Sequence, residues 1–417
     1  MPQFTILRAD RLFDGSGAPP LESAAVLIEG AQVRAIGRIA EVRQPDGAEV
    51  ELHEYGDATI LPGLVDVHTH MMGTGDGTLG DDLVRNNDDD MLLLRAAKNA
   101  RHALTSGVTT ARENGAKGRV AFSLKEGMRR GLVEGPRMVV SGRPLTVTGG
   151  HMGYCGSEAD GVEGVRHEVR QLIKEGADFI KIMATGGSTR TSYALLPSYT
   201  VEELAVATDE AHRFGKLTAA HCANAQGVAN ALEAGIDMII HCVFEDATGI
   251  YEWRQDLAEQ LAAAKAWVNP TLHVARSGVW ALEDDIERNG STPAKLARLD
   301  ALQRSLEHRM EVTGRLAKMG VGVTSGSDSP WSNYAPGLFV HEVELMGDAG
   351  LTNAEALVSA TSDAAASIGM AEHAGLLAAG RQADVLVVDG NPLESLAALW
   401  QVRDVFQAGK RVERPVH

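Results

Sequence analysis

Leu61-Pro62-Gly63-Leu64-Val65-Asp66-Val67-His68-Thr69-His70 is the stretch that decides the fold. An apolar run entered through Pro-Gly predicts a buried strand over 60–70, and side chains two residues apart on a strand point to the same side. His68 and His70 are therefore expected to face together near the carboxyl end of this strand. Two imidazoles on one face form a good chelate for Zn²⁺ or a similar ion, although a His-x-His pair without such a strand would be a weak signal.

Seven further strand-like runs follow along the chain, and helical patterns separate them. Counting the first, the eight expected strands are 60–70, 107–112, 137–141, 178–184, 217–221, 238–241, 267–271 and 322–328. The clearest helical patterns are 90–106, 162–176, 201–215 and 292–320. Continuous apolar strands that alternate with helices predict a parallel sheet covered by helices. Eight such units within residues 59–375 predict a (β/α)8 barrel, with a doubly wound open sheet as the structural alternative.

The two ends of the chain differ from the middle because they read as short strands and turns. Residues 4–7, 25–28 and 32–36 have strand character near the start, and residues 383–388 and 400–412 have it near the end. We therefore expect residues 1–58 and 376–417 to assemble one small β-sandwich beside the barrel.

Composition narrows the class of protein. The 417 residues carry a net charge of −17, which would repel nucleic acid and anionic membranes, so we expect neither as a partner. The chain has no signal-peptide pattern at its start and no apolar stretch of about 18 residues. Cys155, Cys222 and Cys242 show no paired spacing, so a disulfide framework is not expected. These features favour a reduced, cytoplasmic protein.

Single polar residues interrupt or end the later apolar strands. They are Lys181, His221, His241 and Asp328. A lysine inside an apolar strand must lose its hydration, so it either pairs with a buried carboxylate or is neutral and captures CO2 as a carbamate that can bridge two cations. A histidine at a strand end can be a core residue, and an aspartate there can cap the next helix. Together with the His-x-His pair, however, they fall at the carboxyl ends of strands 1, 4, 5, 6 and 8, where barrel enzymes assemble their sites.

The order His-x-His, Lys, His, His, Asp resembles the amidohydrolase superfamily in its binuclear, carboxylated-lysine form. The resemblance covers essentially the whole chain. Four segments, 107–110, 148–151, 176–182 and 378–384, are similar to the branch that holds Xaa-Pro dipeptidases, ochratoxin-type amide hydrolases, phenylurea and thiocarbamate hydrolases and imidazolonepropionase-like proteins.

This resemblance implies a two-metal site and a mechanism. His68, His70 and Asp328 would hold the more buried ion, His221 and His241 the second, and carbamylated Lys181 would bridge both. Zn²⁺ is the first expectation, and the same ligands accept Mn, Co or Ni. A hydroxide between the ions would attack the substrate, and Asp328 would move its proton to the leaving nitrogen. His151 would hydrogen-bond the substrate carbonyl and steady the oxyanion, and the alternative is a plain loop histidine in a Gly-Gly turn.

Three residues are candidate substrate contacts. Trp331 lies close to Asp328 in the sequence, Tyr193 follows strand 4, and Arg112 ends strand 2. Strand 2 also departs from the branch, because it ends Arg112-Glu113-Asn114 where many relatives have Arg-Asp and an apolar residue. A dipeptidase would need a cation for the substrate carboxylate, and Arg112, Arg143 and Arg190 are the candidates.

These features predict a hydrolase that cleaves a carbon–nitrogen bond of a small amide, urea or carbamate, aryl substrates included. The alternatives are a dipeptidase or N-acyl amino acid hydrolase and, more remotely, a barrel that has lost catalysis. The resemblance also implies a homo-oligomer.

Residues 75–80 match the dinucleotide-binding pattern G-x-G-x-x-G, but the acidic residues that follow them would repel a phosphate group. No G-x-S-x-G elbow is present. Cys222 and Cys242 each follow a proposed ligand and are expected to point into the core.

Overall fold

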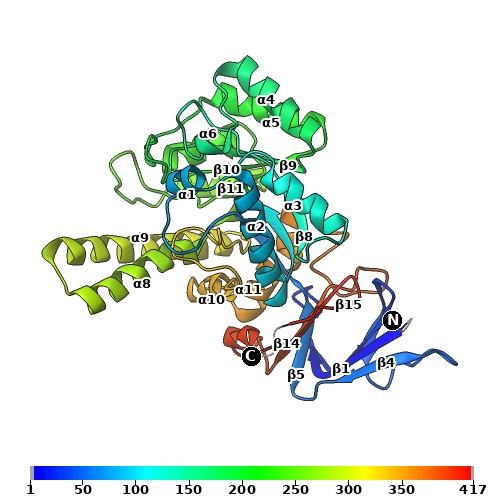
Figure 1. Ribbon diagram of the computed structural model, residues 1–417. Coiled ribbons are helices and arrows are strands. Elements are labelled where there is room, and N and C mark those ends of the chain that lie inside the picture. Colours follow the sequence, from blue (N-terminus) through cyan, green and yellow to red (C-terminus); the bar gives the residue numbers. More distant parts are fainter. Residues whose placement is uncertain (1–3, 415–417) are drawn as a thin grey trace.

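The computed structural model describes residues 4–414. The chain is a mixed α/β protein in which two parallel sheets lie inside a layer of helices (Figure 1). One parallel sheet has the order β6-β7-β8 and the other has the order β12-β11-β10-β9. Their strands are β6 (Leu64–Thr69), β7 (Val108–Glu113), β8 (Arg137–Val140), β9 (Phe179–Met183), β10 (Leu217–His221), β11 (Met238–Ile240) and β12 (Trp267–Asn269).

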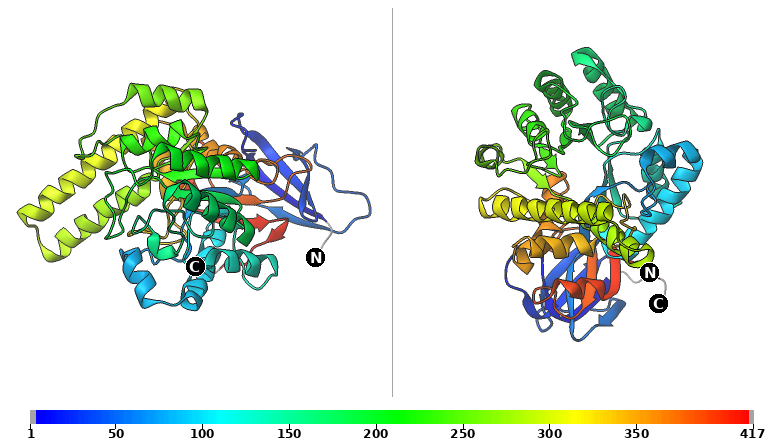
Figure 2. Two further views of the ribbon diagram at one scale, coloured as in Figure 1. Left: turned by 90° about the horizontal axis from the view of Figure 1, so that it is seen from above. Right: turned by 90° about the vertical axis from the view of Figure 1, so that its left-hand side faces the viewer.

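The helices follow the strands in alternation and cover the outside of the two sheets (Figure 2). They are α1 (Gly80–Asn86), α2 (Asp89–Thr105), α3 (Val120–Arg129), α4 (Gly161–Glu175), α5 (Val201–Arg213), α6 (Ala225–Glu233), α7 (Gln255–Ala264), α8 (Leu272–Asn289), α9 (Pro293–Lys318), α10 (Val340–Asp348), α11 (Asn353–Ser359) and α12 (Ser362–Ser367), with single 3₁₀ turns η1 (Gly153–Cys155) and η2 (Leu396–Trp400). The helices expected at 90–106, 162–176, 201–215 and 292–320 are confirmed as α2, α4, α5 and α9. Helices α8 and α9 form an antiparallel hairpin that extends away from the body (Figure 1).

The two ends of the chain share one sheet of eight strands. Its order is β15-β14-β13-β5-β1-β2-β3, with β4 paired to β1. The strands are β1 (Phe4–Leu12), β2 (Leu21–Glu29), β3 (Gln32–Arg38), β4 (Val50–Glu54), β5 (Ala58–Pro62), β13 (Val385–Asp389), β14 (Val402–Gln407) and β15 (Lys410–Arg411). Both termini therefore contribute to one β unit, as the sequence predicted. Its description as a two-layer sandwich stays a prediction.

The first expected strand is divided into two strands at Gly63. β5 pairs with β13 in the terminal sheet, whereas β6 pairs with β7 in a parallel sheet. A Cβ atom at Gly63 would lie 2.2 Å from Thr109 Oγ1, so only glycine allows the chain to pass from one sheet to the other at this point. The stretch 60–70 thus links the β unit directly to the strand that carries His68 and His70.

The expected eighth strand, 322–328, is not a regular strand. It makes only an isolated bridge between Val323 and Val268, although its backbone is hydrogen-bonded on both sides. Thr324 N donates to Val268 O of β12 at 2.8 Å, and Asp328 N donates to His68 O of β6 at 2.7 Å. The segment is rich in glycine and serine, and Asp328 has a left-handed φ of 59°, which interrupts the regular ladder.

A second irregular connection lies at Leu145, between β8 and β9. Leu145 N donates to Lys181 O at 2.8 Å, and Met183 N donates to Leu145 O at 2.9 Å. Both gaps between the two assigned parallel sheets are thus crossed by backbone hydrogen bonds.

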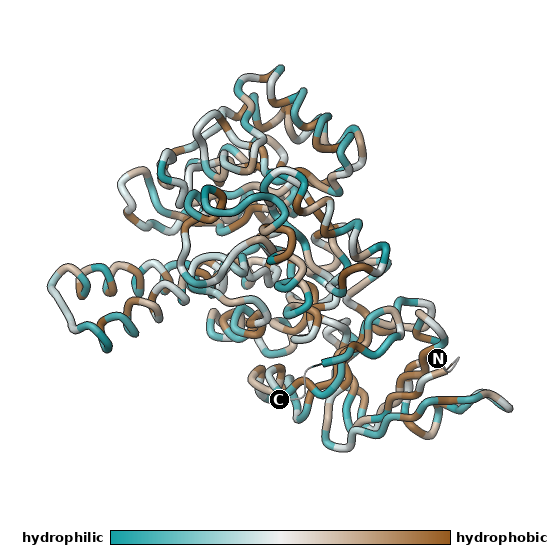
Figure 3. Tube along the Cα trace, viewed as in Figure 1, coloured by the Kyte–Doolittle hydropathy of each residue, from teal (hydrophilic) through white to brown (hydrophobic). Residues whose placement is uncertain are grey.

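Burial explains why these strands lie at the centre. Strands β6, β7, β9 and β11 are buried along their entire length, as expected for parallel strands covered on both faces. Figure 3 shows the hydrophobic colour concentrated along the inner strands and the terminal sheet. Among the described helices, none combines the length and the apolar character that crossing a bilayer would require.

Candidate active site

The expected site residues meet in one cavity of about 360 Å³ at the carboxyl ends of the parallel strands. Its lining includes His68, His70, His151, Lys181, His221, His241, Asp328 and Trp331. His68, Lys181 and His221 lie on β6, β9 and β10, His70 directly follows β6, and Asp328 ends the segment 322–328. His151, His241 and Trp331 lie in the loops that follow β8, β11 and this segment. The fold therefore brings together every metal ligand that the sequence predicted.

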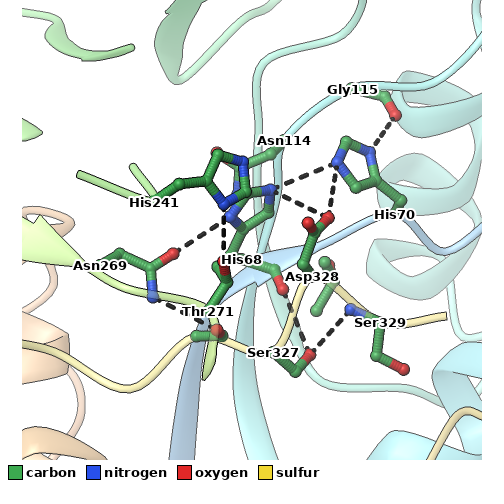
Figure 4. A network of polar contacts seen from close by, with 12 residues as sticks. His68, His70, Asn114, Gly115, His241, Asn269, Thr271, Ser327, Asp328 and Ser329 are labelled. Atoms are coloured by element: carbon green, nitrogen blue, oxygen red, sulfur yellow. Dashed lines mark hydrogen bonds and ion pairs between the residues drawn. The ribbon is translucent and has the colours of Figure 1, made fainter. Parts of the chain in front are cut away.

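His68, His70 and Asp328 form the tightest group (Figure 4). Asp328 Oδ1 lies 3.4 Å from His68 Nε2 and 3.3 Å from His70 Nε2, and the two Nε2 atoms are 3.2 Å apart. All three side chains are buried. One donor atom from each residue can therefore reach a common centre.

The hydrogen-bond partners of the Nδ1 atoms of His68 and His70 determine which ring nitrogen carries the proton. His68 Nδ1 lies 3.0 Å from Asn269 Oδ1, and His70 Nδ1 lies 2.9 Å from the carbonyl of Gly115. Because both partners are acceptors, each Nδ1 carries the proton and each Nε2 presents a lone pair. Burial lowers the pKa of His70 to about 4 and that of His68 well below its usual value, so both rings are neutral. Two lone pairs and a carboxylate oxygen at these distances fit a shared cation.

Asp328 is held in place by the strand that carries the histidines. Ser327 N donates to Asp66 Oδ1 at 2.9 Å, and His68 N donates to the same oxygen at 3.0 Å. The left-handed φ of Asp328 then turns its carboxylate toward the histidines. Burial raises the pKa of Asp328, an effect that the positive charge of Lys181 opposes.

Lys181 is buried at the centre of β9 and faces the cavity. Within residues 4–414, no carboxylate lies within 4.0 Å of its Nζ atom, so the paired-lysine alternative finds no partner in the structure. Burial lowers the pKa of Lys181, and Asp328 opposes the effect. A lysine in this setting has increased neutral, nucleophilic amine character.

His221 and His241 form the second histidine pair, with ring centroids 4.6 Å apart. His221 Nε2 lies 2.9 Å from the carbonyl of Gly186, which leaves its Nδ1 as the available ligand atom. His241 Nδ1 lies 2.6 Å from Thr271 Oγ1, which leaves its Nε2 available. His241 lies one residue beyond β11 and has a φ of 66°, so a left-handed turn, not the strand, aims its ring.

His151 lies in the loop after β8, beside His221. Its ring centroid is 4.7 Å from that of His221, and its Nδ1 lies 3.0 Å from Thr189 Oγ1. Burial lowers its pKa to about 3, so the ring is neutral. The ring of His151 can occupy this position because residue 187 is glycine. A Cβ atom at Gly187 would lie only 2.4 Å from His151 Cδ2.

The three predicted substrate contacts have different positions. Trp331 lines the cavity, with its ring 5.6 Å from that of His70. Arg112 is fully buried below the cavity, donates to Val67 O at 2.8 Å, and does not line the cavity. Tyr193 is 76% exposed on the loop after β9 and also lies outside the lining. Arg112 and Tyr193 are therefore not retained as substrate contacts.

The other two candidate cations are also used elsewhere. Arg143 pairs with Glu175 at 2.7 Å, and Arg190 pairs with Asp82 at 2.6 Å. Cys222 and Cys242 are buried, unpaired and outside the cavity lining, as predicted.

Several residues that contact the predicted ligands or line the cavity were missed by the sequence reasoning. Asp66 could have been found, because it shares the two-residue spacing of His68 and His70 on the same strand. Asn269 lies at the end of β12 and Thr271 soon after it, which are the positions where ligand partners gather. Arg309 of α9 lines the cavity as well, but it is one of many charges on that helix and carried no local signal.

Comparison with known proteins gives a consistent result. The sequence model that describes the Amidohydrolase family matches residues 59–412 of this chain. Ochratoxinase from Aspergillus niger is 27% identical over 449 residues, which cover 99% of this chain and 87% of the relative. Its crystal structure has a TM-score of 0.82 at 25% identity and covers 98% of this chain and 95% of the other.

Two further crystal structures share the fold. A Xaa-Pro dipeptidase with methionine bound in its active site has a TM-score of 0.85 at 24% identity, covering 99% of this chain and 100% of the other. Phenylurea hydrolase B has a TM-score of 0.80 at 20% identity, covering 99% of this chain and 97% of the other. These are relatives of the kinds that the sequence motifs led us to expect.

Proposed function

The chain belongs to the amidohydrolase family, and from that membership and the cavity geometry we propose that it is a metal-dependent hydrolase. The reaction is cleavage of a carbon–nitrogen bond in a small amide, urea or carbamate. We also infer that the parallel strands and the segment 322–329 form a (β/α)8 barrel, supported by the backbone hydrogen bonds that cross both gaps between the sheets.

The observation that carries the proposal is the pair of neutral imidazoles facing one carboxylate. His68, His70 and Asp328 would hold one divalent ion, and His221 Nδ1 with His241 Nε2 would hold a second. Lys181, as a CO2-derived carbamate, would supply the ligand between them. When bound, such ions lower the pKa of water and polarise a carbonyl.

The residues of the chain then have separate tasks. Asp328 accepts a proton from the attacking water and delivers it to the leaving nitrogen, which suits a buried carboxylate with a raised pKa. If Thr189 donates its hydroxyl proton to His151 Nδ1, the ring proton stays on Nε2 and can be donated to the substrate carbonyl. Trp331 forms an apolar wall beside the reacting group and excludes water there.

Metal content and turnover, measured together, test this proposal. We expect about two metal ions per chain in the wild type and fewer in Lys181→Ala, since the bridging ligand is lost. Lys174→Ala is the matched control, because Lys174 is exposed on α4. Turnover is followed on anilides, N-aryl ureas, carbamates and N-acyl amino acids, and we expect one class to be preferred.

Two outcomes would contradict the proposal. Zero or one ion per chain, unchanged by Lys181→Ala, would leave Lys181 as a buried lysine without a bridging task. Absence of turnover on every class after Zn²⁺ or Co²⁺ and bicarbonate are supplied would favour the non-catalytic barrel.

A further inference from the structure

We propose that Arg309 binds a carboxylate of the substrate, so that the substrates are N-acyl amino acids or dipeptides with a free carboxylate. The inference rests on the proposed function of the same cavity and narrows its substrate class. It removes neutral anilides, ureas and carbamates from the first rank of candidates. A carboxylate-bearing substrate would also account for an arginine at a place where the sequence gave no reason to expect one.

Arg309 reaches the cavity from outside the set of metal ligands. It belongs to α9, in the half of the α8–α9 hairpin that returns to the body, and it lines the cavity together with Val274 of α8. Arg309 lines the same cavity as His221 and His241, which would hold the second metal. A group bound by Arg309 would therefore share this cavity with the reacting bond.

The guanidinium of Arg309 has no partner in the part of the chain that the structure describes. Its Nε atom is buried without a hydrogen-bond acceptor, and no carboxylate of residues 4–414 lies within 4.0 Å of the group. A buried charged donor without an acceptor is unfavourable. A ligand that supplies an acceptor removes this cost.

The nearby acidic groups act on Arg309 only from a distance and have other contacts. Glu342 accepts hydrogen bonds from the backbone of Leu272 and His273 at 2.9 and 2.7 Å. Glu245 accepts one from Ser305, and Asp328 lies against His68 and His70. None of these carboxylates neutralises the guanidinium directly.

Arg309 is also the arginine that remains available at this cavity. Arg112, Arg143 and Arg190 are engaged elsewhere, and Lys181 lies among the proposed metal ligands. Of the described residues that line the cavity, Arg309 is the only arginine.

The rest of the lining fits the apolar part of an acyl amino acid. Met152, Met183, Val274 and Trp331 supply apolar walls. A planar guanidinium binds a carboxylate through two parallel hydrogen bonds, which fixes orientation as well as charge. An amino acid carboxylate at Arg309 would thus hold the scissile amide in one orientation toward His151 and Asp328.

A matched substrate pair tests the inference by activity. N-acetyl-L-phenylalanine and its methylamide differ only at the carboxyl end, where the acid carries a negative charge and the methylamide is neutral, and release of acetate is measured for both. We expect the wild type to prefer the acid and Arg309→Gln to lose about tenfold or more in kcat/KM on the acid, with little change on the methylamide. Arg309→Lys should retain part of the preference. Arg304→Gln, an exposed position on the same helix, should match the wild type.

A binding measurement separates this inference from the proposed function, because it needs no turnover. Calorimetry compares 3-phenylpropanoate with 3-phenylpropanol in all four proteins. We expect Arg309→Gln to weaken binding of the carboxylate about tenfold or more and to leave the alcohol unchanged. Equal affinity of wild type and Arg309→Gln for the carboxylate overturns the inference, as does an equal loss of kcat/KM on acid and methylamide. A wild type that binds the carboxylate through Arg309 but hydrolyses no substrate contradicts only the proposed function.

Discussion

At the scale of single residues, the proposed metal ligands are oriented by side chains that hydrogen-bond to them. Asn269 is the clearest case, because its Oδ1 accepts the Nδ1 proton of His68 while its Nδ2 donates to Thr324 O and Gly326 O at 3.2 Å. One side chain thereby fixes the tautomer of His68 and ties it to the segment that carries Asp328. Such partners commonly matter nearly as much as the ligands.

We predict that Asn269→Leu lowers metal affinity about 10- to 100-fold, because His68 loses the acceptor that orients it. Asn269→Asp keeps the acceptor oxygen for His68 but loses the two hydrogen bonds that Nδ2 donates, so it should lower affinity less than Asn269→Leu does. Competition with a metal-binding dye measures both. Equal affinity of Asn269→Leu and wild type would mean that packing alone orients His68.

Glu342, a buried carboxyl that is not one of the proposed metal ligands, leads to a prediction about how the stability of the protein depends on pH. Burial raises its pKa to about 8, although backbone donors of Leu272 and His273 oppose the shift. A carboxyl whose pKa is higher in the folded state stabilises the fold when protonated, and this stabilisation is lost as the pH rises from about 4.5 to 8. Glu342→Gln cannot ionise, so its Tm relative to wild type should rise by about 5 °C between pH 5 and pH 8. A constant difference across that range, measured by thermal unfolding, would contradict the prediction.

At the scale of elements, turns after the strands decide where the side chains point. Four residues around the cavity have a left-handed backbone, with φ values between 50° and 66°: Met152, His241, Thr271 and Asp328. Residues other than glycine seldom adopt this conformation, and those that do are often found at functional sites. Each of these residues lies beyond the end of a strand or in the irregular segment 322–329. The strands supply rigid positions, and the turns aim the side chains inward.

The loop after β9 supports a prediction about His151. Gly187→Ala places a Cβ atom 2.4 Å from His151 Cδ2, so the ring must move away from the substrate carbonyl. We expect kcat to fall about tenfold or more, while metal content and Tm stay near wild type. Gly278→Ala on α8 is the control, because its Cβ atom would meet nothing within 4 Å. Full activity of Gly187→Ala would remove His151 from the mechanism.

At the scale of the whole molecule, the terminal β unit and the parallel sheets that surround the cavity are joined through the first strands. β13 lies between β5 and β14, and β5 leads through Gly63 into β6 with its two histidines. Val385, Val387 and Phe406 pack in the core of the terminal sheet. The segment of the chain nearest its end thus supports the strand that starts the site. The expected homo-oligomer stays a prediction, which mass measurement in solution would test.

Removal of residues 402–417 tests this dependence. The truncation deletes β14 and β15 and leaves β13 as an unpaired edge with apolar side chains uncovered, so we expect little soluble protein. A chain that ends at Arg414 keeps both strands and the hydrogen bonds that the Arg414 side chain donates to Thr105 O and Val402 O, so it should have the wild-type Tm. A soluble 402–417 deletion with full metal content would show that the β unit does not support the site.

The sequence by itself determined the alternation of strands and helices and singled out the polar residues that the structure places in one cavity. Both follow from local patterns, since apolar runs set the strands and polar residues recur where those strands end, whereas the tasks of these residues as metal ligands came from the family resemblance. Periodicity could not reveal the break at Gly63 or the irregular backbone of 322–329, because each depends on contacts with distant strands.

The tertiary structure alone decided which charges remain available. Four arginines look alike in the sequence. Arg112, Arg143 and Arg190 are paired with backbone or carboxylate groups far away in the chain. Arg309 lines the cavity, and its guanidinium has no partner among the described residues. Pairing of long side chains is settled by packing between helices and loops, which leaves no local pattern. The physical reason is that the apolar residues of a strand already indicate that the strand will be buried, whereas a salt bridge depends on how two distant segments pack against each other.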